Sequence, residues 1–458
     1  MAALAALVTL VATGQALAQA PWNGQPISPG LGPTYGETWC ADPAAEPGIA
    51  PQQGPPLALI PYGAIRCTLD KIQAEASAAG LPQRFTYSVV GKTAGGRDHY
   101  EVVVNALETA EQRRDYKRYL QLREIELDDP RRAQKLLRQW GDDVKMPVFI
   151  EANIHGNEEE GGDAMMQVIR DLAMTPLGAN PIVDEVLNHS VLVIIPSMNP
   201  DGRVMGIRQN ENRFDMNRDF LVQSQPEVKN NVRVQQRWLA TNGLALHGYY
   251  NPTLDDGLTK PHNPGMEYDI FAYWNQRRLD DNEARLTAVQ GLPGSNGYGI
   301  QRPVNDFCPW ADHPMWGDFF PNCDAAGTPP SAATAEGWDD WGPVDTQTYI
   351  SLLGIDGSTV EMCNSTALQP VYDPATGDLD DPAGCGGEGR LGSKKAQYVV
   401  FYSSMDYWLS HRAEMMGDQV EIYERGVNDA ERPNCCDDPL VASRGFDEEN
   451  HNWMIEYP

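Results

Sequence analysis

The sequence predicts an α/β fold in which a mixed, mostly parallel central sheet is covered by helices on both faces. Short apolar segments at 146–154 and 191–199 read as strands, and two further strands are expected at 244–250 and 357–363. Continuous apolar runs of this length are typical of strands that are buried on both sides. A helical pattern at 163–173 follows the first of them, and strands that alternate with helices favour a parallel sheet.

The elements before this sheet core follow from local signals. Residues 21–64 are rich in proline and glycine and are expected to form an extended leader. Residues 85–106 alternate around a Gly-Gly pair, which predicts two strands and a turn. Residues 107–140 have helical spacing and mixed charge, and Asp129 before Pro130 provides the N-cap of a second helix there. We expect a solvated helical insertion.

The remaining segments complete the expected domain organisation. Residues 251–335 hold many Pro, Gly and Trp residues and are expected to be a loop-rich insertion, and 396–426 has the pattern of one long amphipathic helix. The catalytic domain should then span 65–430, and 431–458 should be a C-terminal tail.

Composition excludes several classes of protein. The 458 residues are 41% hydrophobic and carry a formal net charge of −29, so the chain can bury a core but repels nucleic acid. The only long apolar run lies at residues 2–13, before A-x-A cleavage signals, which predicts a signal peptide over 1–20, no internal membrane span and a secreted or periplasmic protein. No feature fixes the oligomeric state, and a monomer is the default.

The eight cysteines support export. Their even number in an exported chain suggests disulfides, and the absence of C-x-x-C argues against a structural zinc knot. Neighbours in sequence suggest the pairs 40–67, 308–323 and 363–385, but eight cysteines allow 105 pairings.

Three expected strands end in ionisable residues that do not belong in a core. The first leads into His155 and Glu158, the second into His247, and the third into Glu361. Two imidazoles and a carboxylate, with a fourth position open to water, form a catalytic zinc set, and a further carboxylate beside it suits a general base. The alternative for His155 and Glu158 is a capped loop with a buried, hydrogen-bonded histidine. A second H-x-x-E, at His411 and Glu414, is expected to be a surface pair on the C-terminal helix.

Further motifs lie around this set in a fixed order. They are G-K-T-x-G-G-R at 91–97, H-G-N-E at 155–158, N-P-D-G at 199–202, R-x-N-x-N-x-x-D-x-N-R at 208–218, L-H-G-Y at 246–249 and T-V-E at 359–361. In this order the chain resembles the zinc metallocarboxypeptidases (carboxypeptidase A-like) over roughly 65–430. Each motif is common by itself, whereas the ordered set is specific.

The resemblance implies a role for each matching residue. His155, Glu158 and His247 look like the ligands of one zinc ion per chain, and Glu361 looks like the general base. Arg208 is similar to the arginine that polarises the scissile carbonyl. Asn217 and Arg218 match the pair that binds the free α-carboxylate of a peptide or protein, and an arginine fork suits that role. Tyr249 is expected to contact the substrate.

Alternatives remain open at this point. The same site could serve a cell-wall peptide amidase or peptidase, or the fold could be a zinc-free binding module. Asp345 could select a basic C-terminal residue or be a loop carboxylate satisfied by water. The acidic residues Glu159, Glu160 and Asp163 could steer basic peptides or form a charged first helical turn.

Overall fold

The computed structural model describes residues 24–28, 60–248, 254–257, 268–288, 344–361, 371–373, 378–380 and 389–428. Among them, seven strands form one sheet in the order β1-β2-β4-β3-β5-β7-β6, and a separate pair joins β8 (Val371–Asp373) to β9 (Asp378–Asp380). The strands of the large sheet are β1 (Phe85–Lys92), β2 (Asp98–Val104), β3 (Met146–Ala152), β4 (Ser190–Ile195), β5 (Asn242–Leu246), β6 (Leu254–Gly257) and β7 (Asp356–Glu361).

The sheet is mixed and mostly parallel, as predicted. Strands β4, β3, β5 and β7 pair with one another in parallel. Strands β2 and β6 run antiparallel to them, and β1 is antiparallel to β2, so that it runs in the direction of the central four. The four central strands correspond to the apolar segments of the sequence, and their residues are buried throughout.

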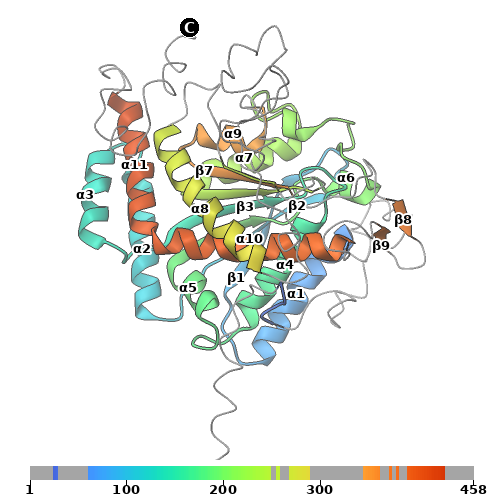
Figure 1. Ribbon diagram of the computed structural model, residues 1–458, viewed down its shortest axis with the longest axis horizontal. Coiled ribbons are helices and arrows are strands. Elements are labelled where there is room, and N and C mark those ends of the chain that lie inside the picture. Colours follow the sequence, from blue (N-terminus) through green and yellow to red (C-terminus); the bar gives the residue numbers. More distant parts are fainter. Residues whose placement is uncertain are drawn as a thin grey trace, which may run out of the picture.

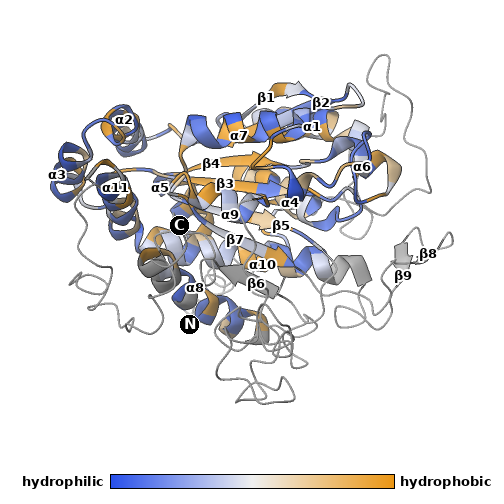
Figure 2. Ribbon diagram, turned by 90° about the horizontal axis from the view of Figure 1, so that it is seen from above, coloured by the Kyte–Doolittle hydropathy of each residue, from blue (hydrophilic) through white to orange (hydrophobic). Residues whose placement is uncertain are grey.

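Helices cover both faces of the sheet. Side chains along a strand alternate between the two faces, so the apolar central strands present hydrophobic side chains on both faces that the helices bury. In β3, Val148 and Ile150 belong to one core, whereas Phe149 belongs to the other. The first core is completed by helices that include α1 (Tyr62–Ala78), α4 (Glu160–Met174), α5 (Pro181–His189), α8 (Tyr268–Ala288) and α10 (Gly389–Ser410). The second is completed by α7 (Pro226–Trp238) and α9 (Thr346–Ser351). The helices surround the strands in Figure 1, and β3 and β4 form a hydrophobic layer in Figure 2.

The range 107–140 forms two helices, α2 (Ala110–Ile125) and α3 (Pro130–Trp140). Thr109 and Gln112 form a capping box at the start of α2, which satisfies backbone N–H groups reciprocally. Asp129 accepts a hydrogen bond from the N–H of Arg132 and caps α3, with Pro130 in the first turn. The predicted second N-terminus is therefore confirmed.

The C-terminal helical pattern is divided, which corrects the prediction of a single helix. Helix α10 ends at Ser410 and α11 (Arg412–Asn428) begins two residues later. The Nδ1 atom of His411, at the break, lies 2.8 Å from the carbonyl oxygen of Tyr407. Helix α11 then packs on α3 rather than continuing along the sheet. Figure 1 shows the change of direction between α10 and α11.

Other elements were not predicted. Helix α1 begins at Tyr62, inside the range expected to be an extended leader, and α8 and β6 lie inside the range 251–335, expected to be rich in loops. Helices α5, α7 and α6 (Pro200–Met205) each begin with proline, which the first helical position tolerates because its N–H has no partner in the helix. Across the residues that the structure covers, no helix combines the length and apolar character of a membrane span. Residues 1–20, the tail 431–458, Tyr249 and seven of the eight cysteines lie outside the described residues.

Candidate metal and catalytic site

The predicted metal ligands meet at one edge of the sheet. Strands β3, β5 and β7 are parallel neighbours, so their carboxyl ends lie together. His155 and Glu158 follow β3, His247 directly follows β5, and Glu361 is the last residue of β7. All four residues are buried, each with 5% or less of its surface exposed. The structure therefore brings together four side chains that lie between positions 155 and 361 of the sequence.

The three expected ligands have the spacing of a metal site. Nδ1 of His155 lies 2.8 Å from Oε1 of Glu158 and 3.3 Å from Nδ1 of His247. Nδ1 of His247 lies 3.1 Å from Oε2 of Glu158. Zinc bonds of about 2.0–2.1 Å in a tetrahedral arrangement place ligand atoms about 3.3 Å apart. The donor set and its spacing fit zinc.

The chemistry of these atoms also favours a bound metal ion. Nη1 of Arg208 lies 3.1 Å from Nδ1 of His155. A guanidinium only donates, whereas Oε1 of Glu158, 2.8 Å from the same nitrogen, only accepts, so this nitrogen cannot satisfy both neighbours at once. A second imidazole nitrogen and a carboxylate beside it form a concentration of lone pairs with little exposure to water. A divalent cation would satisfy them together. Oε1 of Glu361 lies 4.0 Å from Nδ1 of His247 and so faces the same cluster.

The loop that carries His155 and Glu158 is held closely against α6. A Cβ atom on Gly156 would lie 2.0 Å from the carbonyl carbon of Gly202, so only glycine fits. Asn199 caps α6 by accepting from the N–H of Gly202 at 2.8 Å. The amide of Asn199 donates to the carbonyl oxygens of Ile154 at 3.2 Å and Arg208 at 3.0 Å. The N-P-D-G motif thus joins the ligand loop to the segment with Arg208.

Asp201 of the same motif supports the hairpin between β1 and β2. Its carboxylate pairs with Nη1 of Arg97 at 2.7 Å and accepts from the hydroxyl of Thr93 at 2.9 Å. It also accepts from the N–H of Gly95 at 2.7 Å. The G-K-T-x-G-G-R motif therefore has a structural role in binding Asp201.

Sequence reasoning missed Asp215, which joins three expected site residues. Oδ1 of Asp215 lies 3.4 Å from Nε2 of His155 and accepts from the N–H of Asn217 at 3.0 Å. Oδ2 accepts from Nε of Arg208 at 2.9 Å. Burial raises the pKa of the Asp215 carboxyl, but His155 and Arg208 more than offset this and hold the pKa well below its ordinary value. The only signal in the sequence was its place within the motif at 208–218.

Asn217 and Arg218 lie on a short turn (Met216–Arg218) that Asp215 caps. The side-chain oxygen of Asn217 accepts from the N–H of Thr346 at the start of α9, at 3.1 Å. Nη1 of Arg218 donates to the carbonyl of Asn217 at 2.8 Å, and Arg218 is half-buried. These contacts hold the pair next to α9 and link it through Asp215 to His155.

The structure decides the alternatives that the sequence left open for two groups of acidic residues, correcting both for Asp345 and bearing out the charged first helical turn for the others. Asp345 caps α9 by accepting from the N–H of Thr348 at 2.8 Å and is 6% exposed, so it is neither a water-satisfied loop residue nor available to select a substrate side chain. Glu159, Glu160 and Asp163 are each 2% exposed or less, and Asp163 pairs with Arg203 at 2.8 Å. They form the start of α4 rather than a surface that steers peptides.

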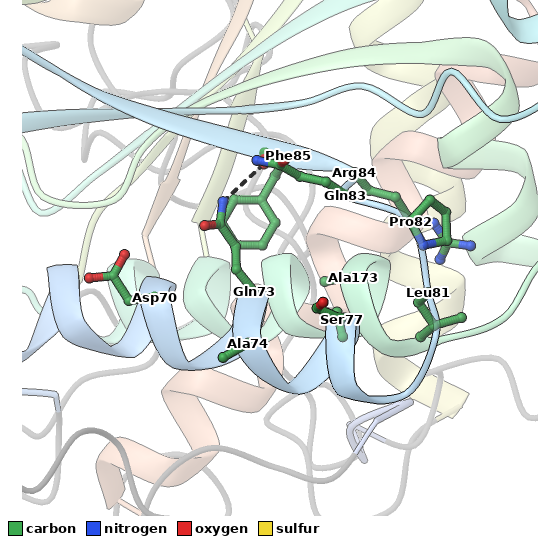
Figure 3. Close-up of a pocket in the computed structure, with 11 residues that line it drawn as sticks. Asp70, Gln73, Ala74, Ser77, Leu81, Pro82, Gln83, Arg84, Phe85 and Ala173 are labelled. Carbon is green, nitrogen blue, oxygen red and sulfur yellow. Dashed lines mark hydrogen bonds between the residues drawn. The ribbon is translucent and has the colours of Figure 1, made fainter.

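A hollow of about 400 Å³ lies elsewhere, between α1 and the start of β1. Figure 3 shows its lining, in which the Gln73 amide donates to the carbonyl of Phe85 at 3.1 Å. None of its lining residues belongs to the metal cluster or to the expected substrate-binding residues.

Comparison with known proteins agrees with the geometry. Residues 73–242 match the zinc carboxypeptidase family model. The mouse (Mus musculus) carboxypeptidase Z is 26% identical over 158 residues, covering 32% of this chain and 20% of that protein. Human carboxypeptidase D is 36% identical over 169 residues, covering 32% of this chain and 12% of that protein. The chain therefore spans a fifth or less of the length of these relatives.

Solved structures also resemble the chain. A metallo-carboxypeptidase from Pseudomonas aeruginosa in complex with (2-guanidinoethylmercapto)succinic acid aligns with a TM-score of 0.45 and 17% identity, covering 76% of this chain and 69% of that one. A metallo-carboxypeptidase from Burkholderia cenocepacia aligns with a TM-score of 0.43 and 16% identity, covering 74% and 69% of the two chains.

Proposed function

We propose that the protein is a zinc-dependent carboxypeptidase that hydrolyses the C-terminal peptide bond of peptides or proteins, and the match of residues 73–242 to the zinc carboxypeptidase family model supports this proposal. The observation that carries the proposal is the convergence of His155, Glu158 and His247 with Glu361 at adjacent strand ends. Zinc held by the first three residues would polarise the scissile carbonyl and make water a stronger nucleophile.

The chain's own residues supply the remaining steps. The Glu361 carboxylate takes a proton from the attacking water and passes it to the departing amine, so that hydrolysis leaves a shortened peptide and a free amino acid. Arg208 donates hydrogen bonds to the carbonyl oxygen as negative charge develops there. The contact of Arg208 with Asp215 at 2.9 Å supports this role, because it fixes the guanidinium beside the ligand cluster before substrate binds.

Specificity for chain ends rests on Arg218 and Asn217. A guanidinium binds a carboxylate in a bidentate manner, and the Asn217 amide adds a donor with a fixed direction. Its direction is set because the side-chain oxygen already accepts from Thr346. This pair requires a free α-carboxylate next to the bond that is cut, so residues should leave one at a time.

A matched pair of peptides tests the proposal. Peptides with free C-termini and the same peptides with amidated C-termini are incubated with the zinc-loaded protein, and the products are identified by mass spectrometry. We expect stepwise loss of C-terminal residues from the free peptides alone, and loss of this activity with a chelator until zinc is restored. Equal cleavage of the amidated peptides, or cleavage within the chain, would overturn the proposal.

We also propose that the protein is exported, on the basis of the apolar run at 2–13 and the A-x-A signals that follow it. N-terminal sequencing of the protein recovered from cells that express the full sequence should find an end after residue 18 or 20. Recovery of the uncleaved chain from the cytosol would contradict this.

A further inference from the structure

Asn153 has a backbone conformation that few residues adopt. It follows the last residue of β3, precedes His155 by two residues, and has a φ of 60°. The left-handed region is uncommon for residues with a side chain, and asparagine tolerates it better than most. Its side chain is fully buried. A strained conformation beside a site suggests that the side chain is needed there.

The side-chain amide of Asn153 bonds the backbone of the ligand loop at three points. Nδ2 donates to the carbonyl oxygens of His155 at 2.7 Å, Gly156 at 3.1 Å and Glu158 at 3.1 Å. Two of these carbonyls belong to the metal ligands themselves. The amide therefore closes the loop into a tight turn in which His155 and Glu158 face the same point.

The main chain of Asn153 reaches the third ligand. Its N–H donates to the carbonyl of Leu246 at 3.3 Å, and Leu246 directly precedes His247. One residue thus contacts the backbone of His155 and Glu158 and of the residue next to His247. Its own carbonyl accepts from the N–H of Asn199 at 3.0 Å, which also fixes it to the N-P-D-G motif.

The orientation of the amide is set from the other side. Oδ1 of Asn153 accepts from the hydroxyl of Ser197 at 2.7 Å, and Nη1 of Arg203 lies 3.5 Å from it. Since a guanidinium cannot accept a hydrogen bond, Oδ1 must face Arg203 and the NH₂ group must face the three carbonyls. The amide cannot flip without losing contacts on both sides.

We propose that Asn153 is the positioning residue that sets the metal site in its binding geometry before the metal arrives. The inference rests on the proposed function only in taking zinc as the metal. Groups that orient ligands from outside typically account for about 10–100-fold in metal affinity. Asn153 acts on the backbones of the ligand residues rather than on the ligand atoms, so its loss should weaken binding by leaving the loop free to spread.

Two variants and a control test this. Asn153→Gly keeps the backbone able to adopt a positive φ and removes the amide, whereas Asn153→Asp keeps the shape and removes the donors. Asn180→Gly is the control, because it removes the same side chain from another buried position, the N-cap of α5, where Asn180 accepts from the N–H of Ile182 at 3.1 Å. Zinc affinity is measured by competition with a chromogenic chelator, and the visible spectrum of the Co²⁺-substituted protein reports the ligand geometry. Circular dichroism of each metal-free protein checks folding.

We expect both Asn153 variants to bind zinc about 10–100-fold more weakly with an altered Co²⁺ spectrum, and Asn180→Gly to stay within about threefold of the parent. Parental zinc affinity in a folded Asn153→Gly or Asn153→Asp would overturn the inference. An equal loss in Asn180→Gly would also overturn it, because zinc affinity would then respond to the loss of any buried asparagine. A parent that binds zinc but leaves peptide C-termini intact would refute the proposed function alone.

Discussion

The Asp215 carboxylate lies 3.4 Å from Nε2 of His155, on the side of the ring away from the other two expected ligands. A carboxylate in this position fixes the ring orientation and makes the opposite nitrogen a better ligand. The same carboxylate accepts two donors of Arg208, each at 2.9 Å, so it holds the expected ligand and the expected carbonyl-binding arginine at once.

Asp215→Asn should therefore lower both zinc affinity and turnover. The amide keeps the size of the side chain but loses the charge that pairs with Arg208 and the second acceptor oxygen. We expect zinc affinity to fall by about 10–100-fold, with a further loss of kcat at saturating zinc. Asp201→Asn is the matched control, because Asp201 holds Arg97 and the β1–β2 hairpin. It should lower the melting temperature without changing zinc affinity, and equal zinc affinities in Asp215→Asn and the parent would contradict the expected role.

Glu361→Gln should abolish most of the hydrolysis while the metal stays bound. The amide cannot take a proton from water, and general base catalysis is worth about 10²–10⁴-fold in rate. Glu361 Oε1 lies 4.0 Å from the nearest ligand nitrogen, so its loss should leave the three-residue metal cluster intact. The measurement is kcat together with zinc content by atomic spectroscopy. Full activity with zinc bound would exclude Glu361 as the base.

Arg218→Lys should weaken recognition of the free carboxylate more than it slows the chemistry. Lysine keeps the charge but cannot make two parallel hydrogen bonds, and each bond to a charged group is worth about 1.5–3 kcal/mol. We expect KM for free peptides to rise about tenfold or more, with a smaller effect on kcat. Arg213→Lys, exposed on the same segment, is the control and should leave KM as it is. A fall in kcat with unchanged KM would contradict the assigned role.

The four central strands, β3, β4, β5 and β7, could be predicted because burial on two faces leaves continuous apolar runs in the sequence. The helices α5, α6 and α7 could not be predicted. Each begins at a proline, and a proline in the sequence indicates a turn as readily as the start of a helix. The break at His411 has no local signal either, because neither proline nor glycine adjoins it. Its cause is tertiary: α10 packs on α4 and α8, whereas α11 packs on α3.

The functional site also has residues that could be predicted from the sequence and residues that could not. His155, Glu158, His247 and Glu361 could be predicted together because parallel strands bring their carboxyl ends to one edge. Asn153 and Asp215 could not, because their contacts with Leu246 and His155 exist only after the chain has folded. For Asp345, the sequence suggested a functional role where the structure shows a structural one. Its position suggested a specificity pocket, but a carboxylate three residues before Thr348 is also well placed to cap a helix, and that is what it does.

Glu151 should make the stability of the metal-free protein depend on pH. It is 1% exposed in β3, and burial raises the pKa of its carboxyl to about 7, although Thr346 and Asn231 donate to it. The unfolded chain has the ordinary value of about 4.3. Between these values the folded state holds a proton that the unfolded state has lost, so the free energy of unfolding falls as pH rises through this range.

Glu151→Gln removes this titration and should flatten the decline in the free energy of unfolding between pH 5 and pH 8 by about 1–3 kcal/mol. Urea unfolding with a chelator present measures it. Glu111→Gln is the control, because the pKa of this exposed carboxyl is lowered by hydrogen bonds to its own backbone N–H and to Thr109 and therefore lies below the range. Parallel curves for the parent and Glu151→Gln would show that Glu151 is ionised in the folded protein.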